Sequence, residues 1–463
     1  MLKRILSLAV CVMFPWLWIS SAQQSDRLPS APLPLVLPLV LPQAQAMPQS
    51  AAADGEETLT LQQAEQLALR NNPRVSVAAL IALAQRQVVR ETRSGELPSL
   101  YGNATGVAAE QASRIGSGEL SASQLLNHVG AGAEFSQLIT DFGRTPNLVA
   151  SSALQAKAAE QDSLATQEDI VLATDLAFYS ALEAQATLQV ATGTVNERKS
   201  VSDQVSALTA SKLKSTLDQS FAQVNLSQAR LLLLDSQNQA EAAMAQLNDI
   251  LGTEGDHHYR LLDDPNPPPA IVSSADEIIA MAIQQRPDLK SLQLTHDSDV
   301  RFSRAQHMQL LPTVSAEGIA GITPVGSSTY FTPNWYGAAG VKVSIPIFNG
   351  FKFSAEATEA DLRAKASDQR SRQLVDRIVR DVKTAWLAAS TARQRMSVTA
   401  ELLKEANTAL DLAQSRYQLG LSSIVELSQA QLQQTQAQID GANARFEYEA
   451  GLAALRFQSG SHP

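Results

Sequence analysis

Residues 335–350 decide the fold class, and they read Trp-Tyr-Gly-Ala-Ala-Gly-Val-Lys-Val-Ser-Ile-Pro-Ile-Phe-Asn-Gly. One parity is apolar or small, whereas the other carries Tyr336, Ala338, Gly340, Lys342 and Ser344. The apolar parity consists of Trp335, Gly337, Ala339, Val341, Val343, Ile345 and Ile347. A period of two with one apolar face predicts a β-strand. Such strands occur in soluble sandwiches and in membranes, and a length of about ten residues suits a bilayer.

Aromatic residues gather at one end of this strand. They are Tyr330, Phe331, Trp335 and Tyr336. Aromatic side chains collect at the interface between lipid and water. The cluster therefore favours the bilayer interpretation and predicts part of an interfacial girdle.

The chain contains an internal duplication. The paired landmarks are Pro73 and Pro287, Pro98 and Pro312, Gly143 and Gly350, and Asp218 and Glu426. They recur in the same order at offsets of 207 to 214 residues. Self-similarity over such a distance predicts two copies of one structural unit.

Each copy is predicted to contain a helix, a pair of strands, a long helix and a further helix. The predicted boundaries are 58–252 for the first copy (strands about 99–143, helices 146–252), 253–272 for a Pro-rich linker, 273–458 for the second copy (strands about 313–349, helices 351–458) and 459–463 for a tail. Junctions between strands and helices are predicted at Pro98, Gly143, Pro312, Pro346 and Gly350. Pro98 and Pro312 are expected to end the helices before the strands, since proline lacks the backbone donor.

The N-terminus has the pattern of a secretory signal. A basic start, an apolar stretch and small residues predict a signal peptide at residues 1–22, with cleavage after Ala46 as the alternative. Residues 23–57 are predicted to be a flexible Pro/Ala-rich segment, and Cys11 is expected to leave with the signal. No later stretch reaches the about 20 apolar residues of a membrane helix. A membrane-embedded part would therefore consist of strands.

Long helices follow each strand pair. In the second copy, small and apolar residues keep a strict 3,4 spacing that predicts a coiled-coil seam. This seam consists of Val382, Ala385, Ala389, Ala392, Met396, Thr399, Leu403, Ala406, Leu410, Ala413 and Tyr417. At 1.5 Å per residue, a helix from Phe351 to Tyr417 would extend roughly 100 Å, which suits a rod or a tunnel wall.

The predicted strands are too few to close a membrane barrel. The sequence supplies about four, whereas the smallest bilayer barrels have eight. An open sheet edge in lipid would leave backbone donors and acceptors unsatisfied. If these strands span a membrane, identical chains must share one barrel.

Composition excludes several functional classes. The chain has 463 residues, a net charge of -10 and one cysteine. The acidic balance argues against nucleic acid binding, and a single thiol excludes an internal disulfide or a multi-thiolate metal site. Common hydrolase, phosphate-binding and dinucleotide motifs are absent. We therefore expect no catalytic residue, no cofactor and no metal ion; the pair His257 and His258 is interpreted as part of a loop.

Asp218 and Glu426 each follow a predicted helix break. A carboxylate at the start of a helix is favoured by the helix dipole, and this capping role alone would explain both residues. The functional alternative requires symmetry. Copies brought near an axis would form a carboxylate ring that repels anions and favours cations.

The most specific segment is residues 416–427, which read Arg-Tyr-Gln-Leu-Gly-Leu-Ser-Ser-Ile-Val-Glu-Leu. Together with the repeated proline pairs and the junction at residues 344–350, it resembles TolC-type outer-membrane factors. These are the exit ducts of Gram-negative efflux pumps and type I secretion systems. The resemblance covers about residues 58–458.

The resemblance implies a mainly α protein with a transmembrane β portion. It implies a homotrimer with one twelve-stranded β-barrel, four strands from each chain, above a long periplasmic α-helical coiled-coil tunnel. The implied location is the outer membrane, in contact with its lipid. The implied partners are a periplasmic adaptor (membrane fusion) protein and an inner-membrane pump.

The implied function is a passive exit duct that opens at its periplasmic tip. Asp218 and Glu426 would lie near this tip, and Gly420, Ser422, Ser423 and Gln429 would form or adjoin its turn. Two positions depart from the family, whose members often have a basic residue where Ser422 stands and an acidic one where Gln429 stands. The alternative function is a periplasmic coiled-coil scaffold or adaptor without a channel.

Overall fold

The computed structural model describes residues 57–107, 114–117, 120–124, 128–253, 255, 257–263, 268–271, 274–322 and 335–460. All of them belong to one compact unit, Glu56–Pro463. The predicted signal peptide and nearly all of the predicted segment 23–57 lie outside the described residues, as do Tyr330 and Phe331.

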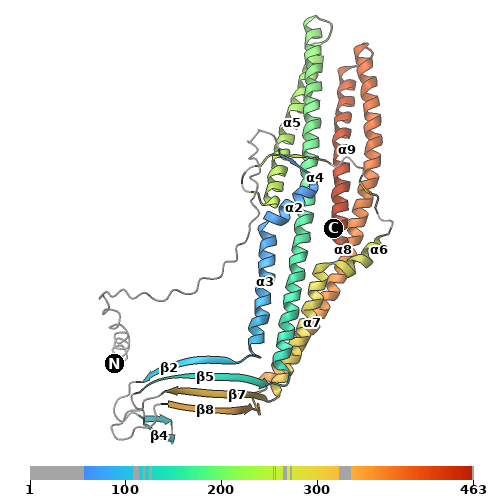
Figure 1. The fold of residues 1–463 in the computed structure, drawn as a ribbon. Coiled ribbons are helices and arrows are strands. Elements are labelled where there is room, and N and C mark those ends of the chain that lie inside the picture. Colours follow the sequence, from blue (N-terminus) through green and yellow to red (C-terminus); the bar gives the residue numbers. More distant parts are fainter. Residues whose placement is uncertain are drawn as a thin grey trace, which may run out of the picture. The chain divides into compact units, whose positions relative to one another are not determined.

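The two halves carry the same main elements in the same order (Figure 1). The first half contains α2 (Leu61–Asn71), α3 (Pro73–Ser94), β2 (Ser99–Val107), β5 (His128–Thr140), α4 (Arg144–Ala210) and α5 (Thr216–Leu251). The second half contains α6 (Ala275–Gln285), α7 (Pro287–His307), β7 (Thr313–Ile322), β8 (Trp335–Ser344), α8 (Lys352–Gln418) and α9 (Ile424–Ser459). The duplication extends to helix length, because α4 and α8 have 67 residues each and α5 and α9 have 36 each.

Two helices, rather than the predicted one, precede each strand pair. The chain breaks at Asn72 and at Arg286, whose ψ angles are both 123°. A residue before proline is disfavoured in the helical region, whereas Pro73 and Pro287 suit the first position of the next helix. The prolines that begin the landmark pairs therefore divide the helices.

Pro98 and Pro312 do not end helices, contrary to the prediction. Helix α3 ends at Ser94, and α7 ends at His307 before a 3-10 turn at Met308–Leu310. Each proline instead directly precedes a strand. The helices therefore stop several residues before these prolines, and the prolines lie at the entry to the sheet.

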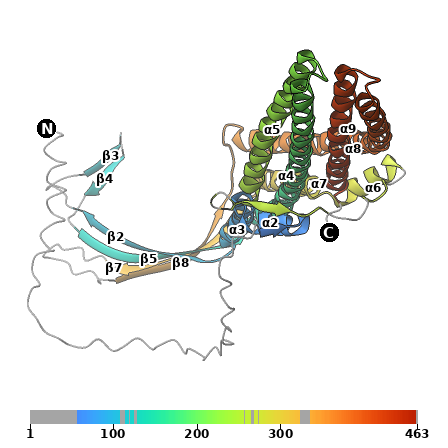
Figure 2. The same cartoon turned by 90° about the horizontal axis from the view of Figure 1, so that it is seen from above.

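The strand pairs of the two halves form one antiparallel sheet in the order β2-β5-β7-β8. This sheet is visibly curved (Figure 2). Strand β8 ends at Ser344, before the predicted boundary of 349. Pro346, two residues further on, has no backbone donor for a sheet hydrogen bond. A short hairpin of β3 (Arg114–Ser117) and β4 (Leu120–Gln124), which the sequence did not predict, lies between β2 and β5 in the chain.

The sheet has one apolar and one mainly polar face. Register places Leu100, Phe135, Gly318 and Ala339 on the apolar face, together with Trp335 and Val341 of β8. The apolar side chains are exposed in the single chain, with Trp335 at 72%. The opposite face carries Asn103, Glu134, Glu317 and Lys342, and the last two form an ion pair of 3.1 Å.

Tyr336 lies on the polar face, opposite Trp335, as the alternation of the strand predicts. Consecutive strand residues point to opposite faces. A Cβ atom added at Gly132 or Gly321 would lie within 2.8 Å of the Tyr336 hydroxyl. The ring of Tyr336 therefore covers these glycines.

The long helices form two antiparallel hairpins, α4 with α5 and α8 with α9, and helices of the two hairpins pack on each other (Figure 1). The predicted seam of α8 is confirmed, since each of its members from Val382 to Tyr417 is buried or half-buried. Within the described part of the chain, no helix combines the length and the apolar character needed to cross a membrane.

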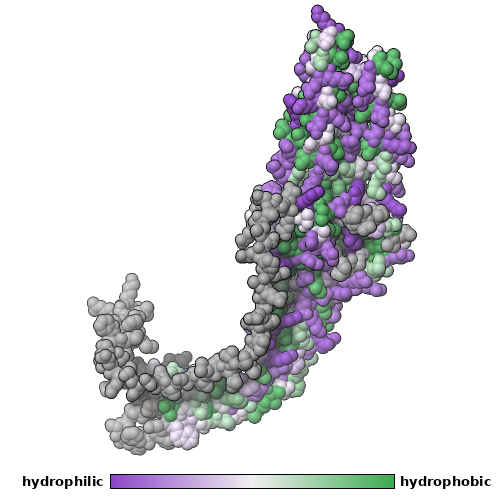
Figure 3. All heavy atoms as spheres, turned by 45° about the horizontal axis from the view of Figure 1, so that its top comes forward, coloured by the Kyte–Doolittle hydropathy of each residue, from purple (hydrophilic) through white to green (hydrophobic). Residues whose placement is uncertain are grey.

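The largest apolar core of the described residues lies where α2 packs against the long helices. It combines α2, α4, α5 and α9, and its largest members include Phe178, Leu247 and Leu251. A parallel pair of three-residue strands, β1 (Glu57–Leu59) and β6 (Tyr259–Leu261), adjoins it. The sequence did not predict this pair. Apolar residues also appear on the surface of the helical part and of the sheet (Figure 3), so the single chain leaves apolar area uncovered.

Candidate functional site

The ends of the two helical hairpins carry most of the residues predicted to form a gate. In each turn one residue adopts a left-handed conformation, Lys212 with φ 63° and Gly420 with φ 72°. Ser215 and Ser423 then cap the following helices, and their hydroxyls accept hydrogen bonds from the backbone N–H groups of Asp218 and Glu426. Both turns therefore use the same backbone geometry.

The two predicted gate carboxylates have different partners. Asp218 closes a capping box, because its Oδ2 accepts from the backbone N–H of Ser215 at 3.0 Å and from the Ser215 hydroxyl at 2.8 Å. Glu426 instead lies 3.2 Å from Nε of Arg416 at the end of α8. Both ion-pair side chains are about half exposed. The capping interpretation thus applies more fully to Asp218 than to Glu426.

Two contacts link the hairpins near their ends. The Nζ atom of Lys214 lies 4.1 Å from the ring centre of Tyr417. Tyr417 is buried, and its hydroxyl has no hydrogen-bond partner among the described residues. Burial, with a smaller contribution from the Asp218 charge, raises the pKa of Tyr417. A hydrogen bond of 2.6 Å from Asn225 of α5 to Ser428 of α9 adds a second link.

Other predicted turn residues do not form a polar lock. The hydroxyl of Ser422 is buried and lacks a hydrogen-bond partner among the described residues, and Gln429 is exposed. Leu213, Leu419 and Leu421 are each exposed beside the turns. The prediction missed Arg416 and Lys214 as contributors. The relevant signal was their place within one turn of a predicted helix break.

The predicted junctions redirect the chain from sheet to helix. Gly143 has φ 101°, and Gly350 and Phe351 have φ near 65°; this left-handed region favours glycine. Asp141, which the sequence analysis did not single out, caps the start of α4, because its Oδ2 accepts from the backbone N–H of Thr145 at 2.7 Å. The junctions therefore set helix direction.

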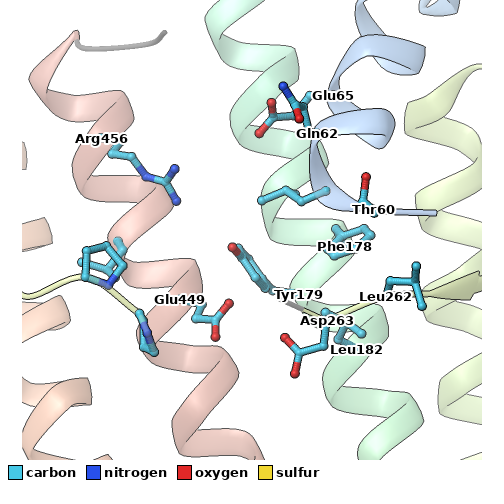
Figure 4. Close-up of a pocket in the computed structure, with 14 residues that line it drawn as sticks. Thr60, Gln62, Glu65, Phe178, Tyr179, Leu182, Leu262, Asp263, Glu449 and Arg456 are labelled. Atoms are coloured by element: carbon cyan, nitrogen blue, oxygen red, sulfur yellow. The ribbon is translucent and has the colours of Figure 1, made fainter. Parts of the chain in front are cut away.

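A cleft of about 660 Å³ lies between α2, α4 and α9 (Figure 4). Tyr179 projects toward it from α4, and Glu449 projects from α9. Arg445 pairs with Asp263 at 2.7 Å and with Glu449 at 3.5 Å. Burial first, then the nearby Asp263 charge, raises the pKa of Glu449 despite the Arg445 charge and a hydrogen bond with Tyr179. These contacts join α9 to α4 and to the segment that contains Asp263.

Asp175 of α4 is only 2% exposed, and Glu65, which interacts with it, lines the cleft. Burial first, and then the charge of Glu65 from α2 and a hydrogen bond with it, raises the pKa of Asp175 to about 8. Two carboxyl groups can share a hydrogen bond only if one holds a proton.

In the described part of the chain, no group of three acidic, histidine or cysteine side chains could hold a metal ion. Residues His257 and Tyr259 stack with their ring centres 5.9 Å apart.

The chain thus combines a curved amphipathic sheet with two long helical hairpins. Residues 64–253 and 278–461 match the sequence profile of the outer membrane efflux protein family. The chain belongs to this family, and each matched segment is one copy of the duplication. It is an outer membrane protein of a Gram-negative bacterium, with its helical part in the periplasm.

Relatives in this family match the chain over most of its length and over most of their own. The chain is 24% identical to outer membrane protein OprJ of Pseudomonas aeruginosa over 79% of its own length and 76% of the relative's. It is 22% identical to outer membrane protein TolC of Escherichia coli, covering 84% and 79% of the two chains. The solvent efflux pump outer membrane protein SrpC of Pseudomonas putida is 22% identical, over 79% and 77%.

Solved structures confirm the fold. The Campylobacter jejuni CmeC outer membrane channel superposes with a TM-score of 0.76 at 17% identity, covering 86% of this chain and 85% of that one. The structure of CusC gives a TM-score of 0.75 at 19% identity, covering 89% and 96%. The predictions of a mainly α protein with a β portion, of the outer-membrane location and of the TolC-type family are confirmed.

Proposed function

We propose that this chain is one third of a passive exit duct in a tripartite efflux pump or type I secretion system. Three copies would form a twelve-stranded barrel above a helical tunnel. An inner-membrane pump would supply energy, and a periplasmic adaptor would open the tip. The amphipathic sheet carries this proposal, because its apolar face suits lipid and its polar face suits a water-filled interior.

Uncovered surfaces support assembly from identical chains. In the four-stranded sheet, β2 and β8 are edge strands with one partner each among the described strands. Open edges in lipid leave backbone groups unsatisfied, so β8 of one copy would pair with β2 of the next. Helix α3 also exposes an apolar set made of Val77, Leu80, Ile81, Leu83 and Val88. A neighbouring copy would cover this set.

The hairpin ends would act as the gate. Opening would require the turns near Lys212–Asp218 and Tyr417–Glu426 to move apart like an iris, which would break the contact between Lys214 and Tyr417. Copies of Asp218 and Glu426 around the axis would then favour cations. Since Arg416 neutralises part of the Glu426 charge, we expect the preference for cations to be moderate.

Bilayer conductance tests this proposal. The purified protein should form pores, and Asp218→Asn combined with Glu426→Gln should shift the reversal potential in a salt gradient toward zero. These isosteres keep the capping hydrogen bonds. Glu401→Gln, an exposed change on α8, is the matched control. A protein without pores would refute the duct, and an unchanged reversal potential would refute the carboxylate ring.

A periplasmic scaffold without a channel is the second candidate. The long helices suit it equally well, but a scaffold has no need for a sheet with an exposed apolar face. Cell fractionation with a heat-modifiable oligomer assay separates the two. A monomeric, soluble periplasmic species would support the scaffold.

A further inference from the structure

A buried arginine lies between the two helical hairpins. Arg198 of α4 is 6% exposed, and its Nη2 donates a hydrogen bond of 3.2 Å to the Thr435 hydroxyl of α9. Its Nη1 is buried without a partner, and it forms no ion pair with any carboxylate in the described part of the chain. Burial lowers the pKa of Arg198, opposed by the charge of the adjacent, exposed Glu197. A buried, unpaired cation destabilises the packing that surrounds it.

Other buried polar side chains surround Arg198. We call this set the polar layer; its members are Thr194, Arg198 and Ser202 on α4 and Gln431, Gln434 and Thr435 on α9. The side-chain amide of Gln434 donates a hydrogen bond of 3.3 Å to Asn407 of α8, and the Thr435 hydroxyl donates one to the Gln431 carbonyl. Among the described residues, the bond between Arg198 and Thr435 is the only side-chain hydrogen bond within this layer that joins α4 to α9.

The polar layer divides two apolar clusters. On the side of the turns lies the cluster of Val205, Ala222, Tyr417, Ile424 and Leu427. On the side of the sheet lies the large core that contains Phe178 and Phe446. Arg198 is 13 residues from Ser211 at the turn, which corresponds to about 20 Å of helix. If the seam opened at this level, water would hydrate polar side chains and would not come into contact with apolar surface.

The second copy has an alanine at the position equivalent to Arg198. Helices α4 and α8 have equal lengths, so Arg198 and Ala406 occupy the same position counted from their first residues. Ala406 is also buried in its seam. The arginine is therefore a specific departure of the first copy.

We propose that the polar layer is the hinge at which the outer parts of the two hairpins separate when the gate opens, and that Arg198 favours the open state. In the closed state the guanidinium is desolvated without a counter-charge, whereas separation hydrates it. The apolar cluster near the turns and the contact between Lys214 and Tyr417 then oppose separation. This inference rests on the proposed duct, because it concerns the opening of the same gate.

Two substitutions test the hinge with opposite expected signs. Arg198→Met keeps the length of the side chain but removes the charge, so the fraction of time spent open should fall at least about tenfold. Thr435→Val removes the one hydrogen-bond partner and leaves the charge, so opening should increase. If Arg198 were a latch that holds the gate closed, both variants would open more. That result, or an unchanged Arg198→Met variant, would overturn the proposal.

Bilayer recordings measure opening, and amide hydrogen exchange measures seam stability independently of conduction. Arg198→Met should slow exchange in residues 194–205 and 424–437, whereas the exposed neighbour Lys199→Met, with the same change of charge, should not. Faster exchange in Arg198→Met would refute the hinge. If the wild-type protein does not conduct, the duct proposal fails, while the exchange result still decides whether Arg198 loosens this seam.

Discussion

Replacing Asp175 by asparagine should stabilise the packing of α2 on α4 at alkaline pH. Asp175 is almost fully buried, and one of its carboxyl oxygens has no partner among the described residues. Glu65 of α2 faces it, and the charge of Arg456 from α9 acts on it only as the last of the contributions. The site therefore disfavours ionised Asp175.

The sign of the pH effect follows from proton binding. The pKa of Asp175 rises from an ordinary value of 3.8 to about 8 in the folded chain. Between these values the folded state binds the proton and the opened state releases it, so the free energy of opening falls as pH rises. Each pH unit in this window lowers it by about 1.4 kcal/mol, which amounts to about 4 kcal/mol between pH 5 and pH 8. Above the folded pKa the loss is complete.

Hydrogen exchange in α2, corrected for intrinsic rates, reports this local opening directly. Protection in the wild-type protein should fall from pH 5 to pH 8 and then level off. Asp175→Asn should remove most of the dependence, whereas Asp203→Asn, an exposed change on the same helix, should retain it. Equal slopes in the wild-type protein and the Asp175→Asn variant would refute the assignment of the buried proton.

Two further predictions concern the sheet and the turns. Gly321→Ala should destabilise the sheet by about 1–3 kcal/mol, since the new Cβ would lie 2.7 Å from the backbone carbonyl oxygen of Ala131. Heat stability should fall, while Gly102→Ala, with open space around it, should change little. Arg416→Met should alter stability by less than about 1 kcal/mol because its ion pair with Glu426 is half exposed, and thermal unfolding in low and high salt checks this. A large salt-dependent loss would contradict it.

Residue periodicity was sufficient to predict the sheet and the long helices. Alternation in residues 335–344 predicted β8 because the two faces of the sheet have different environments. The 3,4 spacing predicted the buried seam of α8 for the same reason. The breaks at Asn72 and Arg286 were missed although both precede proline, because the apolar pattern continues across them.

Contacts between distant segments were harder to predict. The strands β1 and β6 have three residues each, too few to establish a period. The burial of Arg198 depends on α9, more than 200 residues away, and arginine alone ordinarily predicts an exposed position. Likewise, alternation places Tyr336 opposite Trp335, but only the register with β5 and β7 brings its ring over the two glycines.

The equivalent turns separate what the duplication conserves from what it leaves free. Lys212 and Gly420 occupy the same position after α4 and α8 and share a left-handed backbone. A lysine accepts this conformation at a cost of about 1–2 kcal/mol that glycine avoids, so the antiparallel hairpin, not the local residue, determines the turn. Side chains could then diverge without altering the backbone. Arg198 and Lys214 belong to the first hairpin only. The arginine that favours separation and the lysine whose contact with Tyr417 opposes it therefore both lie in the first copy of the duplication.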